Sequence, residues 1–254
     1  MIHVVSLDRT SQRFEAFHTA NPAADILRVP AIGGVLQDRE TWIAEDLITA
    51  ANRYTPAALG CAASHIGLWR HAVSTGATLT IAEDDVVLRA DFTARSEAAI
   101  ASLSAWDIIL WSWNYDWPVK LTPAPGVPGL VLQADQINID QDIAAFTSDT
   151  TPPALLRLSS AAGLCCYSIT QAGARRLPAA CLPIGAEPAS YVPKPPITWA
   201  NSGIDIEACR HYTSSAAYLA LPPLAMAMNV QAMSTIRGQL AVIHDPSKAN
   251  KALV

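Results

Sequence analysis

The sequence has few charged residues and no excess of basic ones. Only 15% of its 254 residues are charged, and the formal net charge is −5. Nucleic-acid-binding proteins present basic surfaces to the phosphate backbone, so this composition argues against nucleic acid as a partner. An anionic substrate would need local help from a metal ion or from arginines.

The chain also lacks the features of a secreted or membrane-spanning protein. Its five cysteines include no C-x-x-C pair, and an odd number in a chain of this size fits reduced thiols in the cytoplasm. The N-terminal residues 2–5 read as a strand rather than a targeting segment. The longest apolar run, Ala216 to Met228, is too short to cross a bilayer. We therefore expect a cytoplasmic protein, with any association at the inner membrane being peripheral.

The most informative stretch runs from residue 55 to residue 92. Its first half predicts a helix, since Thr55 is a good N-cap, Pro56 fits the first helical position and Gly76 suits a left-handed C-cap. Apolar residues recur at helical spacing within it: Leu59, Ala62, Ile66, Trp69 and Val73. A neighbouring face of small residues would let another backbone or a ligand approach closely: Gly60, Ala63, Ser64 and Gly67.

The second half of this stretch predicts an apolar strand, 79–82, that runs directly into Glu83, Asp84 and Asp85. Three adjacent carboxylates at the end of a buried strand repel one another, and a bound cation would relieve that repulsion. In an extended segment the side chains of Glu83 and Asp85 point to the same side. The alternative interpretation is a solvated turn after a buried strand.

Strands alternate with helices in the first half of the chain. The expected strands are 2–7, 26–32, 79–82 and 106–111. This alternation predicts an open, mostly parallel sheet covered by helices on both faces. Ligands bind beyond the carboxyl ends of the strands in such sheets. Asp8, Arg9, the acidic triplet and Asn114 are therefore expected along one edge.

The second half is less regular, and no repeat or domain boundary is visible, so we expect a single domain over residues 1–254. A proline-rich loop over 178–196 is long enough for a lid or an acceptor surface. The other expected elements are a strand at 161–169, a helix capped by Thr170, a helix at 204–212 and an apolar strand at 218–228.

The sequence resembles glycosyltransferase family 25, which includes bacterial lipooligosaccharide galactosyltransferases. The resemblance rests mainly on the helix containing Gly60-Cys61, Ser64-His65 and Trp69, followed by the strand and the acidic triplet. Residues 117–158 do not match well. Smaller patches of resemblance occur at 6–9 with Arg13, at 167–169 with Gly173-Ala174, at Asp205 and at 223–236.

The resemblance implies a GT-A-like α/β domain with a Rossmann-like sheet. It implies inverting transfer of a sugar, UDP-galactose being the expected donor, to a cell-envelope glycan such as lipooligosaccharide. Two other functions stay open: a metal-dependent nucleotide phosphohydrolase that uses the same triplet, and a non-catalytic glycan-binding protein on a degenerate transferase fold. The sugar, the acceptor and the oligomeric state stay open as well.

Glycosyl transfer needs a cation for the leaving diphosphate and a base for the acceptor hydroxyl. The resemblance implies Mn²⁺ or Mg²⁺ held by Glu83 and Asp85, with His244 of V-I-H-D-P-S-K as a third ligand. His244 in an exposed tail is the alternative. Asp205, flanked by two isoleucines, is the expected base, and a helix-start carboxylate is its alternative role. Its rivals are Asp116, Asp140, Asp142 and Glu207.

Arginine suits a diphosphate because its guanidinium donates two hydrogen bonds at once, although Arg9 and Arg13 are equally compatible with solvated surface charges. His65 is either a donor contact or a brace for the acidic strand. The expected donor-binding residues are Ser6, Leu7, Asp8, Arg9, Arg13, Ser64, His65, Asp84 and Lys248. Donor or acceptor contacts are expected from Asn114, Gln231, Ser234 and Arg237.

Overall fold

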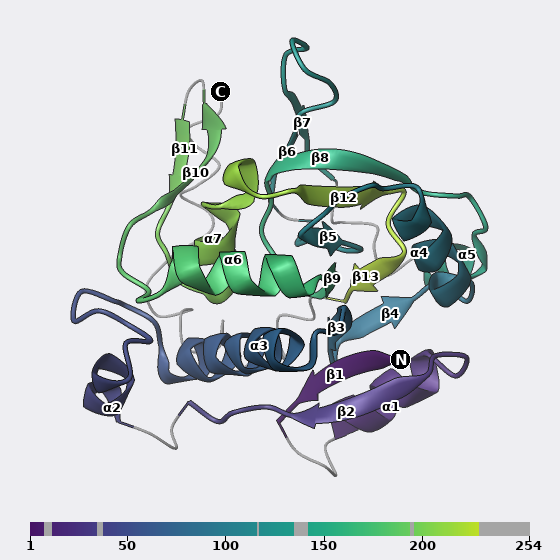
Figure 1. The fold of residues 1–254 in the computed structure, drawn as a ribbon. Coiled ribbons are helices and arrows are strands. Elements are labelled where there is room, and N and C mark those ends of the chain that lie inside the picture. The colour runs from purple at the N-terminus through teal and green to yellow at the C-terminus, as the bar shows by residue number, and fades with distance from the viewer. Residues whose placement is uncertain (8–11, 35–37, 116, 135–141, 194–195, 229–254) are drawn as a thin grey trace.

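A nine-stranded sheet forms the centre of the protein, in the strand order β2-β1-β3-β9-β5-β12-β8-β6-β7 (Figure 1). The computed structural model describes residues 1–7, 12–34, 38–115, 117–134, 142–193 and 196–228, with the backbone alone for 191–193 and 196–197. None of the helices in these ranges combines the length and the hydropathy needed to cross a membrane.

The strands on one side of the sheet are mostly parallel. Strand β9 (Cys166–Ile169) lies between β3 and β5 and is antiparallel to both. The parallel set is β1 (Ile2–Ser6), β2 (Ile26–Pro30), β3 (Leu79–Glu83), β5 (Ile108–Leu110) and β12 (Ala217–Leu221). The sheet continues by antiparallel pairing through β8 (Ala154–Ser160), β6 (Val119–Leu121) and β7 (Leu130–Leu132). The α/β class is therefore confirmed, and the sheet is mixed.

Helices cover both faces of the sheet, as expected. Alternate residues of each strand point to opposite faces, so Ile81 and Tyr167 pack in the core under α3, whereas Ala82 and Cys166 pack in the core under α1 and α4. Helices α3 and α6 lie side by side across the front of the sheet (Figure 1). The first face carries α3 (Pro56–Thr75), α6 (Gln171–Cys181) and α7 (Ile204–Cys209), and the second carries α1 (Gln12–Ala20) and α4 (Phe92–Ala101).

Shorter elements complete the fold. Strand β13 (Ala225–Ala227) pairs with β4 (Val86–Leu88), and β10 (Ala189–Pro193) pairs with β11 (Pro196–Trp199). The short helices are α2 (Arg39–Ala44), α5 (Ile143–Ser148) and the 3₁₀ turn Tyr212–Ser214.

The helix α3 has the caps that its sequence predicts. The Thr55 hydroxyl accepts a hydrogen bond from the Ala58 N–H at 3.2 Å, and Gly76 adopts a left-handed conformation with φ of 74°. The face of small residues packs against another stretch of backbone at Gly60 and Ser64, since a Cβ atom on Gly60 would lie 2.3 Å from the carbonyl oxygen of Ile32 and Ser64 accepts from the Ile32 N–H. Of the two expected neighbours for this face, a backbone or a ligand, the fold supplies the backbone.

Several element boundaries differ from the sequence-based expectations. Asp38 is a good N-cap and the apolar residues after it predict a helix to about residue 51, but the helix ends at Ala44, and Asp46 beyond it has a φ of 53°. The expected apolar strand 218–228 is divided into β12 and β13 at Pro222-Pro223, because proline lacks the N–H that continued pairing would need. The expected loop 178–196 is shorter, since α6 continues through Pro178 to Cys181 and β10 begins at residue 189.

Candidate active site

The acidic triplet lies at the edge of the sheet where β1, β3 and β5 end and β9 begins. Glu83 is the last residue of β3, and Asp84 and Asp85 form the tight turn into β4. The N–H of Met228, the last described residue, donates to the Asp85 carbonyl at 3.0 Å. Asn114 follows β5 and joins the same edge, where its N–H donates to the Ala162 carbonyl at 2.8 Å. The expected placement of the triplet and Asn114 along one edge is therefore confirmed.

The three carboxylates are divided between two helices, with Asp84 and Asp85 paired to α1 and Glu83 directed to α3. The Nη2 atom of Arg13 on α1 lies 2.6 Å from Asp84 Oδ1 and 3.3 Å from Asp85 Oδ2. Glu83 is directed toward the other face of the sheet, where its Oε1 lies 3.6 Å from Nε2 of His65 on α3. The triplet is thus a junction between the two helical layers, and Arg13 neutralises only part of its charge.

The surroundings of Asp85 disfavour its ionised form. Burial, and then the negative charge of Glu83, raise the pKa of Asp85 to about 7, although the Arg13 guanidinium opposes the shift. Its Oδ1 atom is buried and has no hydrogen-bond partner among the described residues. A divalent cation would ionise this carboxyl group and satisfy that oxygen. Glu83 and Asp85 offer the oxygen ligands that Mg²⁺ and Mn²⁺ prefer, so the site fits such an ion.

Asp205 reaches this edge from the start of α7. The Gly163 N–H, in the turn before β9, donates to Asp205 Oδ2 at 2.9 Å. Burial raises the pKa of Asp205 most strongly, the Gly163 hydrogen bond opposes this, and the charge of Glu83 raises it further. Asp205 and Glu83 are therefore close enough for their charges to interact.

Two cysteine thiols lie close to these carboxylates. Burial, followed by the charge of Glu83, raises the pKa of both the Cys61 and the Cys165 thiols. Cys165 Sγ donates to Asn114 Oδ1 at 3.4 Å. Because their raised pKa values keep both thiols protonated, neither thiol is activated as a nucleophile.

The structure gathers a subset of the residues expected from the sequence at this edge: Arg13, His65, Glu83, Asp84, Asp85, Asn114 and Asp205. Ser6 is buried at the end of β1, and Leu7 beyond it is 55% exposed. The Ser64 hydroxyl donates to the Gly60 carbonyl at 2.7 Å and accepts from the Ile32 N–H at 2.8 Å. Ser64 therefore holds α3 to segment 32–34, and its contact with a donor stays a prediction.

Other expected residues lie outside the described part of the chain: Asp8, Arg9, Gln231, Ser234, Arg237, His244 and Lys248, together with the rival bases Asp116 and Asp140. Of the remaining rivals, Glu207 accepts two hydrogen bonds from Arg210, at 2.7 and 2.9 Å, and one from Asn201. Asp142 is exposed and precedes α5, which contacts the far end of β4 through Thr147. Asp205 is thus the best placed of the described candidates.

The sequence did not predict the roles of several residues that contact the site residues. Trp69 was expected as part of the apolar face of the helix, and Cys61 and Tyr167 as parts of the matching segments. Gly163 was not singled out, although an isolated glycine in an apolar run often marks a close backbone approach. Its φ is 93°, and a Cβ atom there would lie 2.7 Å from the Asn114 nitrogen.

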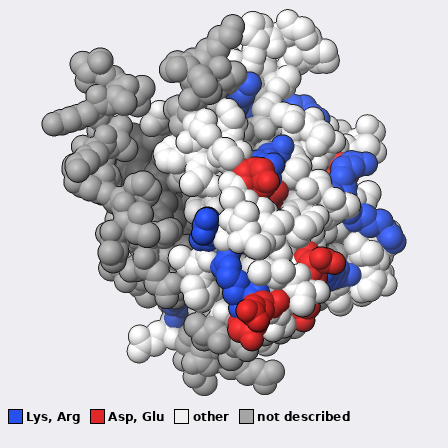
Figure 2. Space-filling view, turned by 90° about the vertical axis from the view of Figure 1, so that its left-hand side faces the viewer, with Lys and Arg blue, Asp and Glu red and all other residues white. Residues whose placement is uncertain are grey.

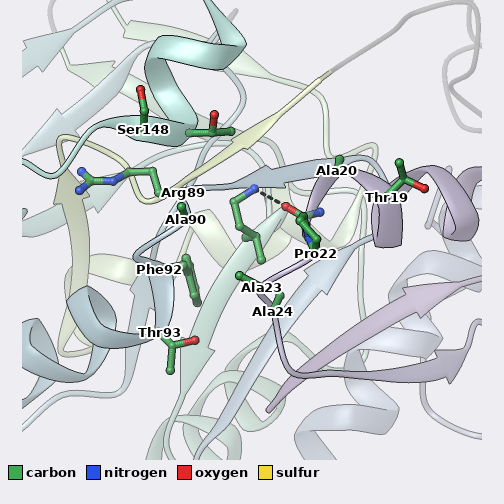
Figure 3. A pocket seen from close by; sticks show the side chains of 13 residues that line it. Thr19, Ala20, Pro22, Ala23, Ala24, Arg89, Ala90, Phe92, Thr93 and Ser148 are labelled. Carbon is green, nitrogen blue, oxygen red and sulfur yellow. Dashed lines mark hydrogen bonds between the residues drawn. The ribbon is translucent and has the colours of Figure 1, made fainter.

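A cavity of 430 Å³ lies at the opposite edge of the sheet, between the end of α1 and the turn from β4 into α4 (Figure 3). The Arg89 guanidinium points away from α1, and it is bound by Asp91 and Asp149. The described lining contains no carboxylate, so this cavity lacks both a carboxylate base and carboxylate ligands for a metal ion. On the face shown in Figure 2, acidic and basic side chains are interspersed, without an extended basic patch among the described residues.

Comparison with known proteins gave one family. The model of Glycosyltransferase family 25 (LPS biosynthesis protein) matches residues 1–189. The matched part holds α1, α3, the acidic triplet and Gly163, whereas Asp205 lies beyond it. No individual curated protein matches the chain.

Proposed function

Because the chain belongs to glycosyltransferase family 25 and is a glycosyltransferase, we propose that it transfers galactose from UDP-galactose to a cell-envelope glycan such as lipooligosaccharide. We propose that the transfer inverts the anomeric centre and requires Mn²⁺ or Mg²⁺. The observation that carries this proposal is the cluster of carboxylates at the carboxyl edge of the sheet, where a buried oxygen of Asp85 has no hydrogen-bond partner in the part of the chain that the structure describes.

Glu83 and Asp85 would hold the cation. When bound, the ion supplies positive charge to the leaving diphosphate, which is the main electrostatic need of this reaction. Arg13 keeps the turn in place by pairing with Asp84, at 2.6 Å, and its guanidinium lies at the edge where a diphosphate would dock. Without the cation and Arg13, the negative charge of the triplet would repel the diphosphate.

Asp205 would act as the base. In a single displacement the acceptor oxygen forms a bond to the anomeric carbon while the bond from that carbon to the diphosphate oxygen breaks. The proton of the acceptor hydroxyl passes to the Asp205 carboxylate. Burial and the charge of Glu83 raise the pKa of Asp205, which makes it a stronger base, and the Gly163 N–H fixes the orientation of the carboxylate.

The direct test is a transfer assay with UDP-galactose and a truncated lipooligosaccharide acceptor, with Mn²⁺ or with a chelator, read by mass spectrometry of the product. Transfer is expected only with the metal.

Asp85→Asn should abolish metal-dependent UDP binding while the protein stays folded, because a ligand oxygen and its charge are lost. Asp142→Asn, which alters an exposed carboxylate near α5, is the matched control and should behave like wild type. Equal UDP binding with and without chelator would exclude the metal, and release of phosphate without an acceptor would favour a phosphohydrolase.

Asp205→Asn tests the base separately. Turnover should fall by about a hundredfold or more, the usual effect of losing general-base catalysis, while UDP-sugar affinity is unchanged. If Asp205 only stabilises the start of α7, the melting temperature should fall and turnover per folded molecule should persist.

A further inference from the structure

Behind the acidic triplet, a row of three buried side chains links α3 and β9 to Glu83. The Trp69 Nε1 atom lies 2.9 Å from the Tyr167 hydroxyl oxygen, which lies 2.9 Å from Nδ1 of His65. The other ring nitrogen of His65, Nε2, faces Glu83 Oε1 at 3.6 Å. Trp69, Tyr167 and His65 are all fully buried.

The hydrogen-bonding capacities of these groups determine where the protons lie. An indole N–H can only donate, so the Tyr167 oxygen accepts from Trp69. The single proton of the buried Tyr167 hydroxyl needs an acceptor, and His65 Nδ1 is the acceptor within hydrogen-bond distance of it among the described residues. Since burial raises the pKa of Tyr167, the hydroxyl keeps that proton. His65 Nδ1 is therefore the acceptor, and the proton of the neutral imidazole is on Nε2.

We propose that this row makes His65 a fixed hydrogen-bond donor to Glu83, and so a positioning residue for the cation. The inference rests on the function proposed above. His65 Nε2 is buried and has no hydrogen-bond partner among the described residues. A separation of 3.6 Å is longer than a hydrogen bond. Rotation of the half-buried Glu83 side chain would bring one carboxylate oxygen within hydrogen-bond distance of His65 Nε2 and leave the other oxygen for the cation.

Another arrangement of the same residues is a soft-metal site. Ligand atoms of Cys61, His65 and Glu83 lie within 4.8 Å of one another, and such sulfur, nitrogen and oxygen donors suit Zn²⁺. Two features oppose it. The Tyr167 hydrogen bond leaves a proton on the nitrogen that would have to bind the metal, and burial raises the pKa of the Cys61 thiol. The geometry therefore favours a hydrogen bond to Glu83.

The first test is the tautomer of His65, measured by ¹⁵N–¹H correlation NMR on the chelator-treated protein labelled at histidine. The Nε2–H pattern is expected. Tyr167→Phe, which retains the ring and removes the hydroxyl, should abolish this preference. An Nδ1–H pattern in the wild type would overturn the proposal, as would loss of the Nε2 proton on addition of Zn²⁺ alone.

The second test measures the apparent affinity for Mn²⁺ through UDP binding. His65→Leu removes the donor and should weaken metal affinity by about 10- to 100-fold, the usual effect of losing a partner of a ligating carboxylate. His65→Gln, which offers an amide N–H in place of Nε2–H, should restore most of it. If His65 served only to keep the protein folded, His65→Leu and His65→Gln with equal melting temperatures would bind Mn²⁺ equally well. Should His65→Leu fail to fold, Tyr167→Phe takes its place, with weaker Mn²⁺ affinity expected.

The outcomes separate this inference from the proposed function. If the wild-type protein binds UDP equally with and without Mn²⁺, the proposed function fails and the positioning role fails with it. If the wild type shows metal-dependent binding and His65→Leu binds Mn²⁺ equally well, only the role of His65 is overturned.

Discussion

The backbone of Gly163 contacts both Asp205, the proposed base, and Asn114. Its φ of 93° is a conformation that side-chain-bearing residues rarely adopt, and an added Cβ atom would lie 2.7 Å from the Asn114 nitrogen. Gly163→Ala should therefore reduce the free energy of unfolding by about 1–3 kcal/mol, measured by urea denaturation. It should also reduce transfer, because the N–H that orients Asp205 would shift.

The control for this substitution is Gly67→Ala. Gly67 is exposed within α3, and an added Cβ atom there would meet nothing within 4 Å. Alanine should raise the free energy of unfolding by up to about 1 kcal/mol at such a helical position. Equal stability changes at the two glycines would contradict the importance assigned to Gly163.

The raised pKa of Asp85 predicts a pH-dependent stability of the metal-free protein. The ordinary value is 3.8 and the folded value is about 7, so the native state binds more protons than the unfolded state between these pH values. The free energy of unfolding contributed by this group therefore falls as pH rises through that window. Glu83 and Asp84 favour the protonated form, whereas Arg13 favours the ionised form.

Denaturation of the chelator-treated protein at several pH values measures this effect. Asp85→Asn cannot ionise, so its stability relative to wild type should increase from pH 5 to pH 7.5. Mn²⁺ should recover wild-type stability at the upper end of that range. Parallel pH profiles for the two proteins would show that Asp85 titrates normally.

Helix α3 depends on close contact with segment 32–34. The Ile32 N–H donates to Ser64, and a Cβ atom on Gly60 would lie 2.3 Å from the Ile32 carbonyl oxygen and 2.5 Å from the Gly34 nitrogen. Gly60→Ala should therefore cost about 1–3 kcal/mol of stability, because backbone rather than a flexible side chain must move. Gly67→Ala on the same helix is again the control. A melting temperature for Gly60→Ala at or above that of wild type would contradict this packing.

Across the fold, the site joins elements from both helical layers, so its ligands should stabilise both layers against unfolding. Arg13 comes from α1, His65 from α3 and Asp205 from α7. UDP with Mn²⁺ at about 100 times its dissociation constant should add about 2.7 kcal/mol, which raises the melting temperature by about 5–10 °C in a protein of this size. Thermal denaturation with and without chelator measures this shift. Asp142→Asn should retain the shift and Asp85→Asn should lose it, and an equal shift in chelator would contradict the metal linkage.

The features that the sequence predicted correctly depend on neighbouring residues. Thr55, Pro56 and Gly76 act within their own helix. Strand β3 was predicted from its own apolar residues, which end at Glu83. The α/β class and the helices on both faces follow from the same local patterns, as does the position of the acidic triplet at a strand end.

Only the tertiary structure decided which segments meet. Local periodicity carries no information on strand direction, so the antiparallel insertion of β9 between β3 and β5 was not predicted. That insertion places Tyr167 beside His65 and Gly163 beside Asp205. The Ser64 hydroxyl, expected at a donor, is engaged by the backbone of segment 32–34. These contacts join residues far apart in the chain, and their geometry follows from packing the two layers onto the sheet, which no short stretch of sequence encodes.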